Sequence, residues 1–172
     1  MLRDFARALF RRPAASDPPG APDMEIAGAL AAQLDSAAQA RLGRSLAILH
    51  VAAGGCGGCA TEVDALGGVA YALERHGLSF VGNPRQADVL LVTGPLTAAM
   101  RTAMEGVWTA MPEPRWVVAV GACAIDGGVF AGSYAVQGGV GIALPVDLIV
   151  EGCPPSPASV LSALLTLIEA NR

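Results

Sequence analysis

The chain has 172 residues, of which 53% are hydrophobic and 15% are charged, and its formal net charge is −4 at pH 7. This length suits one domain with a sizeable core, the apolar fraction excludes a disordered chain, and the acidic balance argues against nucleic acid as the main partner. Because so few charges are available to cover a free surface, we expect part of the surface to be buried against other subunits. An Ala-rich composition in an ordinary soluble domain is the alternative.

The first 23 residues are predicted to form a segment of their own. In residues 1–12, apolar side chains recur at helical spacing among four arginines. This pattern is typical of a basic amphipathic helix on a membrane surface or a partner subunit, and a frayed tail is the alternative. Residues 13–23 are rich in proline and indicate a linker. We predict no secretory signal peptide, and no transmembrane helix anywhere in the chain.

Residues 24–172 are predicted to form a single domain in which helices alternate with short apolar strands. Helices are expected over 24–42, 61–76, 98–111 and 156–171, and strands over 46–51, 78–81, 88–93, 116–120 and 146–150. Residues 127–144 are rich in glycine and are predicted to be mostly irregular. The alternation indicates an α/β fold whose mostly parallel sheet is covered by helices on both faces.

Four cysteines follow three of the five predicted strands. Cys56 and Cys59 lie in a Gly-rich loop after the first strand, Cys123 follows the fourth, and Cys153 follows the fifth. Because the carboxyl ends of parallel strands meet at one edge of a sheet, we expect all four thiols to lie there. Four thiolates that converge from separate loops are able to hold a metal or an iron–sulfur cluster.

The spacing of the cysteines favours an iron–sulfur cluster over the other sites that cysteines form. Zinc sites with four cysteines usually pair two short CxxC motifs, and this chain has one. A thioredoxin-like redox pair would leave Cys123 and Cys153 unexplained. Zinc, thiol redox chemistry and inert cysteines stay open as alternatives. His50 and His76 are expected to be structural, since four cysteines suffice as ligands.

Four stretches resemble the cluster-bearing small subunit shared by complex I, where it is the 20 kDa subunit, and the energy-converting NiFe hydrogenases. They are GGCGGCATEV (54–63), PRQADVLLVTGPLT (84–97), VVAVGACAIDGGVFAG (117–132) and PVDLIVEGCPPSP (145–157). The resemblance implies a flavodoxin-like fold and one 4Fe–4S cluster. It also implies a peripheral position on the cytoplasmic side of a membrane complex. There the partners would be a large catalytic subunit, a ferredoxin-like electron-transfer subunit and membrane subunits.

By position, this resemblance makes Cys56, Cys59, Cys123 and Cys153 the cluster ligands. Glu62, three residues after Cys59, also matches the family pattern. The resemblance implies that Glu62 lies near the subunit junction and takes part in proton transfer. A carboxylate in the first turn of a helix, stabilised by the helix dipole, is the alternative reading of Glu62.

The CxxC spacing of Cys56 and Cys59 separates the branches of this family. The complex I form typically has two adjacent cysteines in this loop, whereas the spaced pair resembles the hydrogenase branch, which includes formate hydrogenlyase. We therefore expect the electron-transfer subunit of a membrane-associated NiFe hydrogenase complex, an oxidoreductase subunit that is not catalytic alone. A complex I-like NADH–quinone or ferredoxin-linked oxidoreductase without nickel is the alternative, and a zinc-stapled scaffold is the second.

Overall fold

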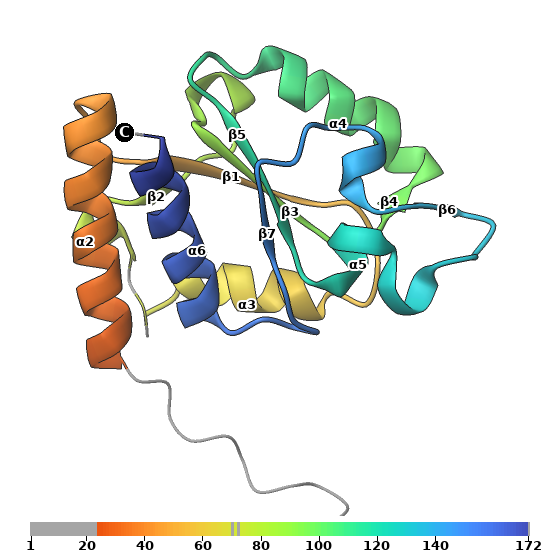
Figure 1. Cartoon of the computed structure of the whole chain (residues 1–172), viewed down its shortest axis with the longest axis horizontal. Coiled ribbons are helices and arrows are strands. Elements are labelled where there is room, and N and C mark those ends of the chain that lie inside the picture. The colour runs from red at the N-terminus through yellow and green to blue at the C-terminus, as the bar shows by residue number, and fades with distance from the viewer. Residues whose placement is uncertain (1–23, 70, 72, 172) are drawn as a thin grey trace, which may run out of the picture.

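The computed structural model describes residues 24–69, 71 and 73–171, which form a parallel sheet between two layers of helices (Figure 1). The strands of this sheet are β1 (Ala47–Ala52), β2 (Ser79–Phe80), β3 (Val89–Thr93), β5 (Trp116–Val120) and β7 (Leu148–Val150). All neighbouring pairs are parallel, in the order β2-β1-β3-β5-β7. This is the strand order of flavodoxin-like sheets, and it confirms the predicted fold class.

Helices cover both faces of the sheet, as predicted. One face is covered by α2 (Met24–Leu42), α3 (Gly58–Gly67) and α6 (Pro157–Ala170), and the other by α4 (Ala98–Ala110) and the short α5 (Ala122–Asp126) (Figure 1). Beside the sheet, β4 (Leu96–Thr97) and β6 (Val136–Gly138) form an antiparallel pair. Single 3-10 turns complete the described chain: η1 (Leu73–His76), η2 (Pro84–Gln86), η3 (Gly128–Phe130) and η4 (Val140–Ile142).

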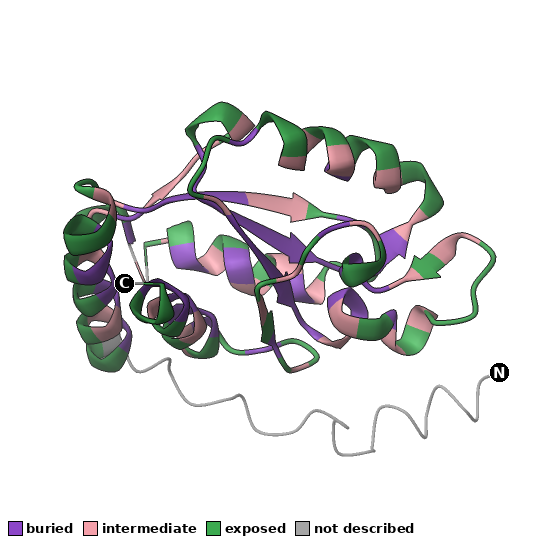
Figure 2. Ribbon diagram, turned by 45° about the horizontal axis from the view of Figure 1, so that its top comes forward, coloured by how far each residue is buried: buried purple, intermediate pink, exposed green. Residues whose placement is uncertain are grey.

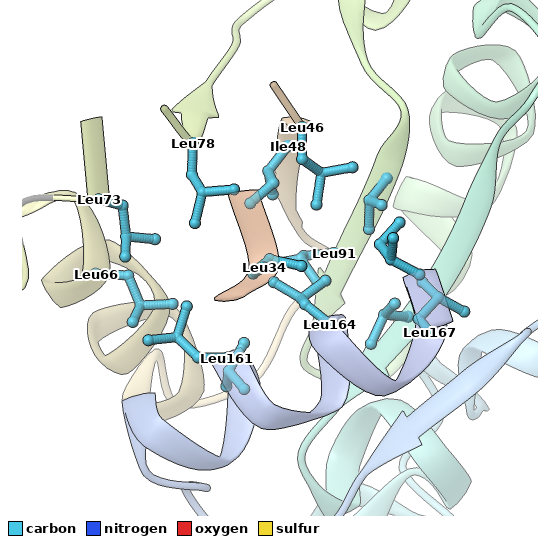
Figure 3. Packing of buried hydrophobic residues seen from close by; sticks show 14 of the residues in the cluster. Leu34, Leu46, Ile48, Leu66, Leu73, Leu78, Leu91, Leu161, Leu164 and Leu167 are labelled. Atoms are coloured by element: carbon cyan, nitrogen blue, oxygen red, sulfur yellow. The ribbon is translucent and has the colours of Figure 1, made fainter. Parts of the chain in front are cut away.

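Strand side chains alternate between two cores. Leu91 and Val118 pack with α2, α3 and α6, whereas Leu90 and Val117 pack on the side of α4. The first core is rich in leucine (Figure 3), and the central strands are buried along their length (Figure 2). Because both faces are buried, a slip of one residue would move every side chain into the wrong core, so the register of the strands is strongly specified.

A buried carboxylate also fixes the start of the central strands. Asp88, just before β3, is fully buried and accepts hydrogen bonds from two guanidinium nitrogens of Arg44, at 2.8 and 2.5 Å. It accepts a third from the N–H of Ala47 on β1, at 3.0 Å. A buried carboxylate needs such partners, so these bonds hold β1 and β3 in one alignment.

Two parts of the predicted secondary structure differ from the structure. The helix predicted over 61–76 begins earlier, at Gly58, and ends at Gly67, because Gly68 adopts an extended backbone with φ −74° and ψ 171°. Two successive glycines weaken a helix, since glycine loses the most conformational freedom when it is ordered. The short α5 and the β4–β6 pair have no counterpart among the predicted elements, whereas the other helices and strands lie within a few residues of their predicted bounds.

The predicted amphipathic segment and the linker, residues 1–23, lie outside the described residues. Within the part of the chain that the structure does describe, no helix combines the length and the hydropathy that crossing a bilayer requires.

Candidate metal centre

The four cysteines lie in the loops that follow β1, β5 and β7, at the carboxyl edge of the parallel sheet. All four are free thiols. Cys59 and Cys123 are buried, with 9% and 5% of their surface exposed, whereas Cys56 and Cys153 are exposed. The structure therefore brings the loops of all four predicted site residues to one edge, with two thiols inside the protein and two at its surface.

Backbone hydrogen bonds join the loop after β5 to the loop after β7. The N–H of Gly121 donates to the carbonyl oxygen of Val150 at 2.8 Å, and the N–H of Ala122 donates to that of Gly152 at 2.9 Å. These bonds continue the β5–β7 ladder past the ends of the strands. The segments that carry Cys123 and Cys153 are thus held side by side by main-chain atoms alone.

Two glycines make room for the buried sulfurs. Gly121 has a φ of +87°, and a Cβ atom at this position would overlap Sγ of Cys59. Gly128 has a φ of +50°, and a Cβ atom there would lie 2.9 Å from Sγ of Cys123. Glycine alone satisfies both the backbone conformation and the close approach. The backbone therefore forms a cradle around the two inner sulfurs.

Cys59 and Cys123, which carry these two sulfurs, each lie in the first turn of a helix. Cys59 is the second residue of α3, which is preceded by Gly57 in the left-handed conformation, with a φ of 83°. Cys123 is likewise the second residue of α5. The start of a helix carries a partial positive charge and unpaired N–H groups, which stabilise a thiolate. The helix predicted to begin at Thr61 begins three residues earlier, at Gly58, so it carries Cys59 itself.

The pKa values of the inner thiols, Cys59 and Cys123, are both raised. Burial raises the pKa of Cys59, and negative charge on Cys123, Cys153 and Cys56 raises it further. Burial also raises the pKa of Cys123, followed by the charge of Cys153, while a hydrogen bond from the Val129 N–H acts in the opposite direction. Cys59 thus lies within electrostatic reach of the other three thiols. Thiols that oppose one another's ionisation bind as thiolates only where a cationic centre compensates their charge.

A pocket at this edge is lined by residues 54–60, Thr93, Gly94 and Cys123. Across the residues that the structure describes, no three His, Cys, Asp or Glu side chains are grouped so that they could hold a metal ion. The donors fit an iron–sulfur cluster by their chemistry, since they are thiols from several loops with backbone N–H groups beside them. The glycine cradle fits the same group, because it leaves space next to the sulfurs.

Glu62 lies on α3, one turn beyond Cys59, and is half-buried. Because α3 begins at Gly58, its first turn holds no acidic residue, so the alternative reading of Glu62 as a first-turn carboxylate is wrong. The pKa of Tyr71 is raised by burial and then by the charge of Glu62.

Thr93 and Gly94 line the pocket without having been singled out in the sequence. Thr93 is the last residue of β3 and is buried, with 2% of its surface exposed. The available signal was its place at the end of an apolar strand, at the same edge as the cysteines.

The chain matches the family model described as NADH ubiquinone oxidoreductase, 20 Kd subunit, over residues 56–167. It is 47% identical over 109 residues to the B subunit of the NADH-quinone oxidoreductase of Citrifermentans bemidjiense, a match that covers 63% of this chain and 64% of that protein. It is 40% identical over 121 residues to formate hydrogenlyase subunit 7 of Escherichia coli, a match that covers 70% of this chain and 48% of that protein. The chain therefore spans less than two thirds of the length of these two relatives.

Among solved structures, the chain resembles one from the membrane-bound sulfane sulfur reductase, described as an archaeal respiratory membrane complex. The TM-score is 0.65 at 30% sequence identity, and the match covers 80% of this chain and 74% of that one.

Proposed function

Because the chain belongs to the family of the NADH ubiquinone oxidoreductase 20 kDa subunit, we propose that it is an electron-transfer subunit that holds one 4Fe–4S cluster through Cys56, Cys59, Cys123 and Cys153. The observation that carries this proposal is the placement of four free thiols in three loops at one sheet edge. A 4Fe–4S cluster supplies one-electron chemistry when it is bound, and the protein supplies ligation, burial and docking.

The two classes of thiol have different roles in this proposal. Cys59 and Cys123 are buried at helix starts and fix the inner side of the site. Cys56 and Cys153 are exposed and close its outer side. In the isolated chain that outer side faces water, so a partner subunit seated on it would exclude solvent and bring a second redox centre within reach.

The complex is proposed to be a membrane-associated NiFe hydrogenase of the formate hydrogenlyase type. The spaced pair Cys56 and Cys59 supports this branch, as does the similarity to formate hydrogenlyase subunit 7. The partners would then be a large nickel-binding subunit, a ferredoxin-like subunit and membrane subunits, with this chain peripheral on the cytoplasmic side. The chain turns over no substrate alone. Glu62 is proposed to carry protons near the junction with the large subunit.

A complex I-like oxidoreductase without nickel is the second candidate. It is supported by the higher identity to the NADH-quinone oxidoreductase relative. In both candidates this chain passes single electrons through the same four-cysteine site. They differ in the partner, so the discriminating measurement is the metal content of the large subunit that is purified with this chain. Nickel bound by paired CxxC motifs of that large subunit supports the hydrogenase, and its absence supports the second candidate.

Electron paramagnetic resonance of the full chain, reconstituted anaerobically and then reduced with dithionite, tests the cluster. A reduced 4Fe–4S cluster is paramagnetic, so we expect a signal that is lost or strongly altered in Cys123→Ser. The matched control is Ser133→Ala, which changes a surface hydroxyl and should leave the signal unchanged. A colourless protein that gives no paramagnetic resonance signal and contains stoichiometric zinc would instead identify the zinc-stapled scaffold.

A further inference from the structure

The strand β7 forms one outer edge of the parallel sheet. Among the described strands it pairs only with β5, where Ala119 lies opposite Ile149. The carbonyl oxygen of Val150 points inward, since it accepts a hydrogen bond from the N–H of Gly121 at 2.8 Å. Backbone groups of successive residues in a strand point to opposite edges, so the N–H and the C=O of Ile149 point outward. The outer edge of β7 therefore offers a donor and an acceptor to a further strand.

The side chains of β7 do not protect this edge. Natural proteins usually blunt an open edge with lysine, proline or a covering segment, because unpaired backbone groups there recruit other strands. β7 consists of Leu148, Ile149 and Val150, and Ile149 has 48% of its surface exposed. No strand of the described chain lies beyond it. The edge is thus both apolar and open to pairing.

A groove runs beside the same strand, where α6 lies next to β7 (Figure 1). Its volume is about 520 Å³, and it is lined by residues 149–151, by Leu30 of α2 and by small side chains of α6, among them Ser159, Ser162 and Thr166. A strand added to β7 would place every second side chain on the side of this groove. The groove therefore gives side chains of such a strand a place to pack.

Two carboxylates flank the edge and favour one kind of partner. Glu151 directly follows β7, is exposed and forms no hydrogen bond or ion pair with the described residues. Asp147 directly precedes β7, and its carboxylate accepts the N–H of Val117 at 2.7 Å. A second copy of this chain, paired antiparallel about Ile149, would bring its Asp147 near Glu151, and like charges across two strands are destabilising. Cations at these positions would instead be attracted, so the edge fits a basic strand.

We propose that the outer edge of β7 docks an extended basic segment of a partner protein, which joins the sheet as an additional strand. The segment carries an apolar or β-branched residue opposite Ile149 and an arginine or lysine on either side, within reach of Asp147 and Glu151. Main-chain hydrogen bonds to Ile149 supply the pairing, and the two carboxylates supply the selectivity. The proposal does not depend on the cysteine site, so either can fail without the other.

The test measures the binding of a fluorescein-labelled peptide, TRTVTRT, to the full chain by fluorescence polarisation. One control peptide, TETVTET, reverses the charges. The other is TRTVTRT methylated on every backbone nitrogen, which keeps the side chains but has no N–H to donate. We expect only the unmethylated basic peptide to bind, and its binding should slow backbone hydrogen exchange in residues 145–152. Equal binding of the methylated peptide would show attraction by charge alone and would overturn the proposal.

Ile149→Pro and Ile149→Val form a matched pair of variants. Proline is tolerated in an edge strand where its N–H would face solvent, but it removes the outward donor, so the peptide should no longer bind. Valine keeps the N–H and a β-branched side chain and should retain binding. Glu151→Gln should weaken binding roughly two- to fivefold, as the loss of one cross-strand charge pair predicts. Denaturant unfolding of each variant checks that the fold is kept.

Three results would contradict the docking of a basic strand at β7. One is binding of the peptide that survives Ile149→Pro, and another is a wild-type chain that does not bind TRTVTRT. The third comes from light scattering of the full chain, where a dimer that Ile149→Pro abolishes would identify a second copy as the occupant of the edge. The comparison of the two TRTVTRT peptides uses the wild type, so it decides the question even where the proline variant fails to fold.

Discussion

Single glycines set how closely the backbone approaches the sulfurs at the cysteine edge. Gly121→Ala should destabilise the protein by about 1–3 kcal/mol, because alanine strains the backbone at a φ of +87° and its Cβ would overlap Sγ of Cys59. The displaced thiol should also lower the iron content after anaerobic reconstitution. Denaturant unfolding and iron analysis measure the two effects.

Gly132→Ala is the matched control for that substitution. Gly132 also has a positive φ, +82°, but a Cβ atom there meets nothing within 4 Å. This variant should lose about 1–2 kcal/mol to the backbone conformation and keep its iron. Equal iron loss in both variants would contradict the claim that Gly121 makes room for Sγ of Cys59.

His50 should make the stability of the metal-free chain depend on pH. Its pKa is lowered by burial in the folded protein and is 6.5 ordinarily, so below that value the unfolded chain binds more protons than the folded one. The contribution of His50 to stability is thus complete above pH 6.5 and is lost as the pH falls through the lower, folded-state pKa. Denaturant unfolding from about pH 7 to 5 should show a steeper loss in the wild type and in His76→Gln than in His50→Gln. Parallel curves for all three would contradict this assignment.

Individual residues differ in how far the sequence predicts their roles. The four cysteines are indicated by residue type and by their position after strands, and they do lie at one edge. Thr93 carries only the positional signal, because it ends a strand at the same edge. Its contact with His50, and that of His50 with Asp64, join β1, β3 and α3, which are distant in the sequence and give no local pattern. For Glu62, the residue could be singled out from the sequence but its position within the helix could not, because α3 begins at Gly58 and not at Thr61.

At the scale of elements, the buried Asp88 should matter most for the alignment of β1 and β3. Asp88→Asn weakens the bonds to Arg44 and Ala47 and leaves buried groups imperfectly paired, so we expect a loss on the order of 2 kcal/mol in the free energy of unfolding. Arg44→Lys keeps the charge but loses the paired geometry and should cost less. If Asp88→Asn leaves the free energy of unfolding unchanged, packing alone sets the register of the strands.

Elements with a continuous apolar pattern were predictable, even the short β2 and β7, whereas α5 and the β4–β6 pair were not. Continuous apolar strands such as β3 and β5 lie at or within one residue of their predicted bounds. The start of α3 was hidden by Gly57 and Gly58, because glycines indicate a loop and carry no helical pattern. The five residues of α5 are too few to show a period. The starts of α3 and α5, neither of which was predicted, both lie at the site. There the backbone adopts conformations that accommodate the sulfurs of Cys59 and Cys123.

At the scale of the whole molecule, residues 24–172 should fold as one domain without the first 23. Among the residues that the structure describes, the members of both hydrophobic cores lie between 27 and 168. If residues 1–23 form a separate segment, as the sequence predicts, a chain that begins at Met24 should match the full chain in its free energy of unfolding to within about 0.5 kcal/mol, as is usual for changes outside a core. Denaturant unfolding of both chains measures this. A markedly lower midpoint in the shorter chain would assign residues 1–23 to the domain.

The topology of the sheet explains why widely separated cysteines share one edge. A parallel sheet in the order β2-β1-β3-β5-β7 sends every strand toward the same side, so the loops after β1, β5 and β7 meet there. Alternation of strands and helices in the sequence sufficed to predict this convergence. The partner that we propose to cover the exposed Cys56 and Cys153 could not be predicted in the same way, because its identity depends on a surface that belongs to another chain.

The stoichiometry of iron and acid-labile sulfide tests the central claim most directly. The full chain, reconstituted anaerobically and freed of unbound metal, should contain about four irons and four sulfides, and each of Cys56→Ser, Cys59→Ser, Cys123→Ser and Cys153→Ser should lower both. Stoichiometric zinc without sulfide in the wild type, or full iron and sulfide in any of the four variants, would contradict a single cluster held by these four thiols.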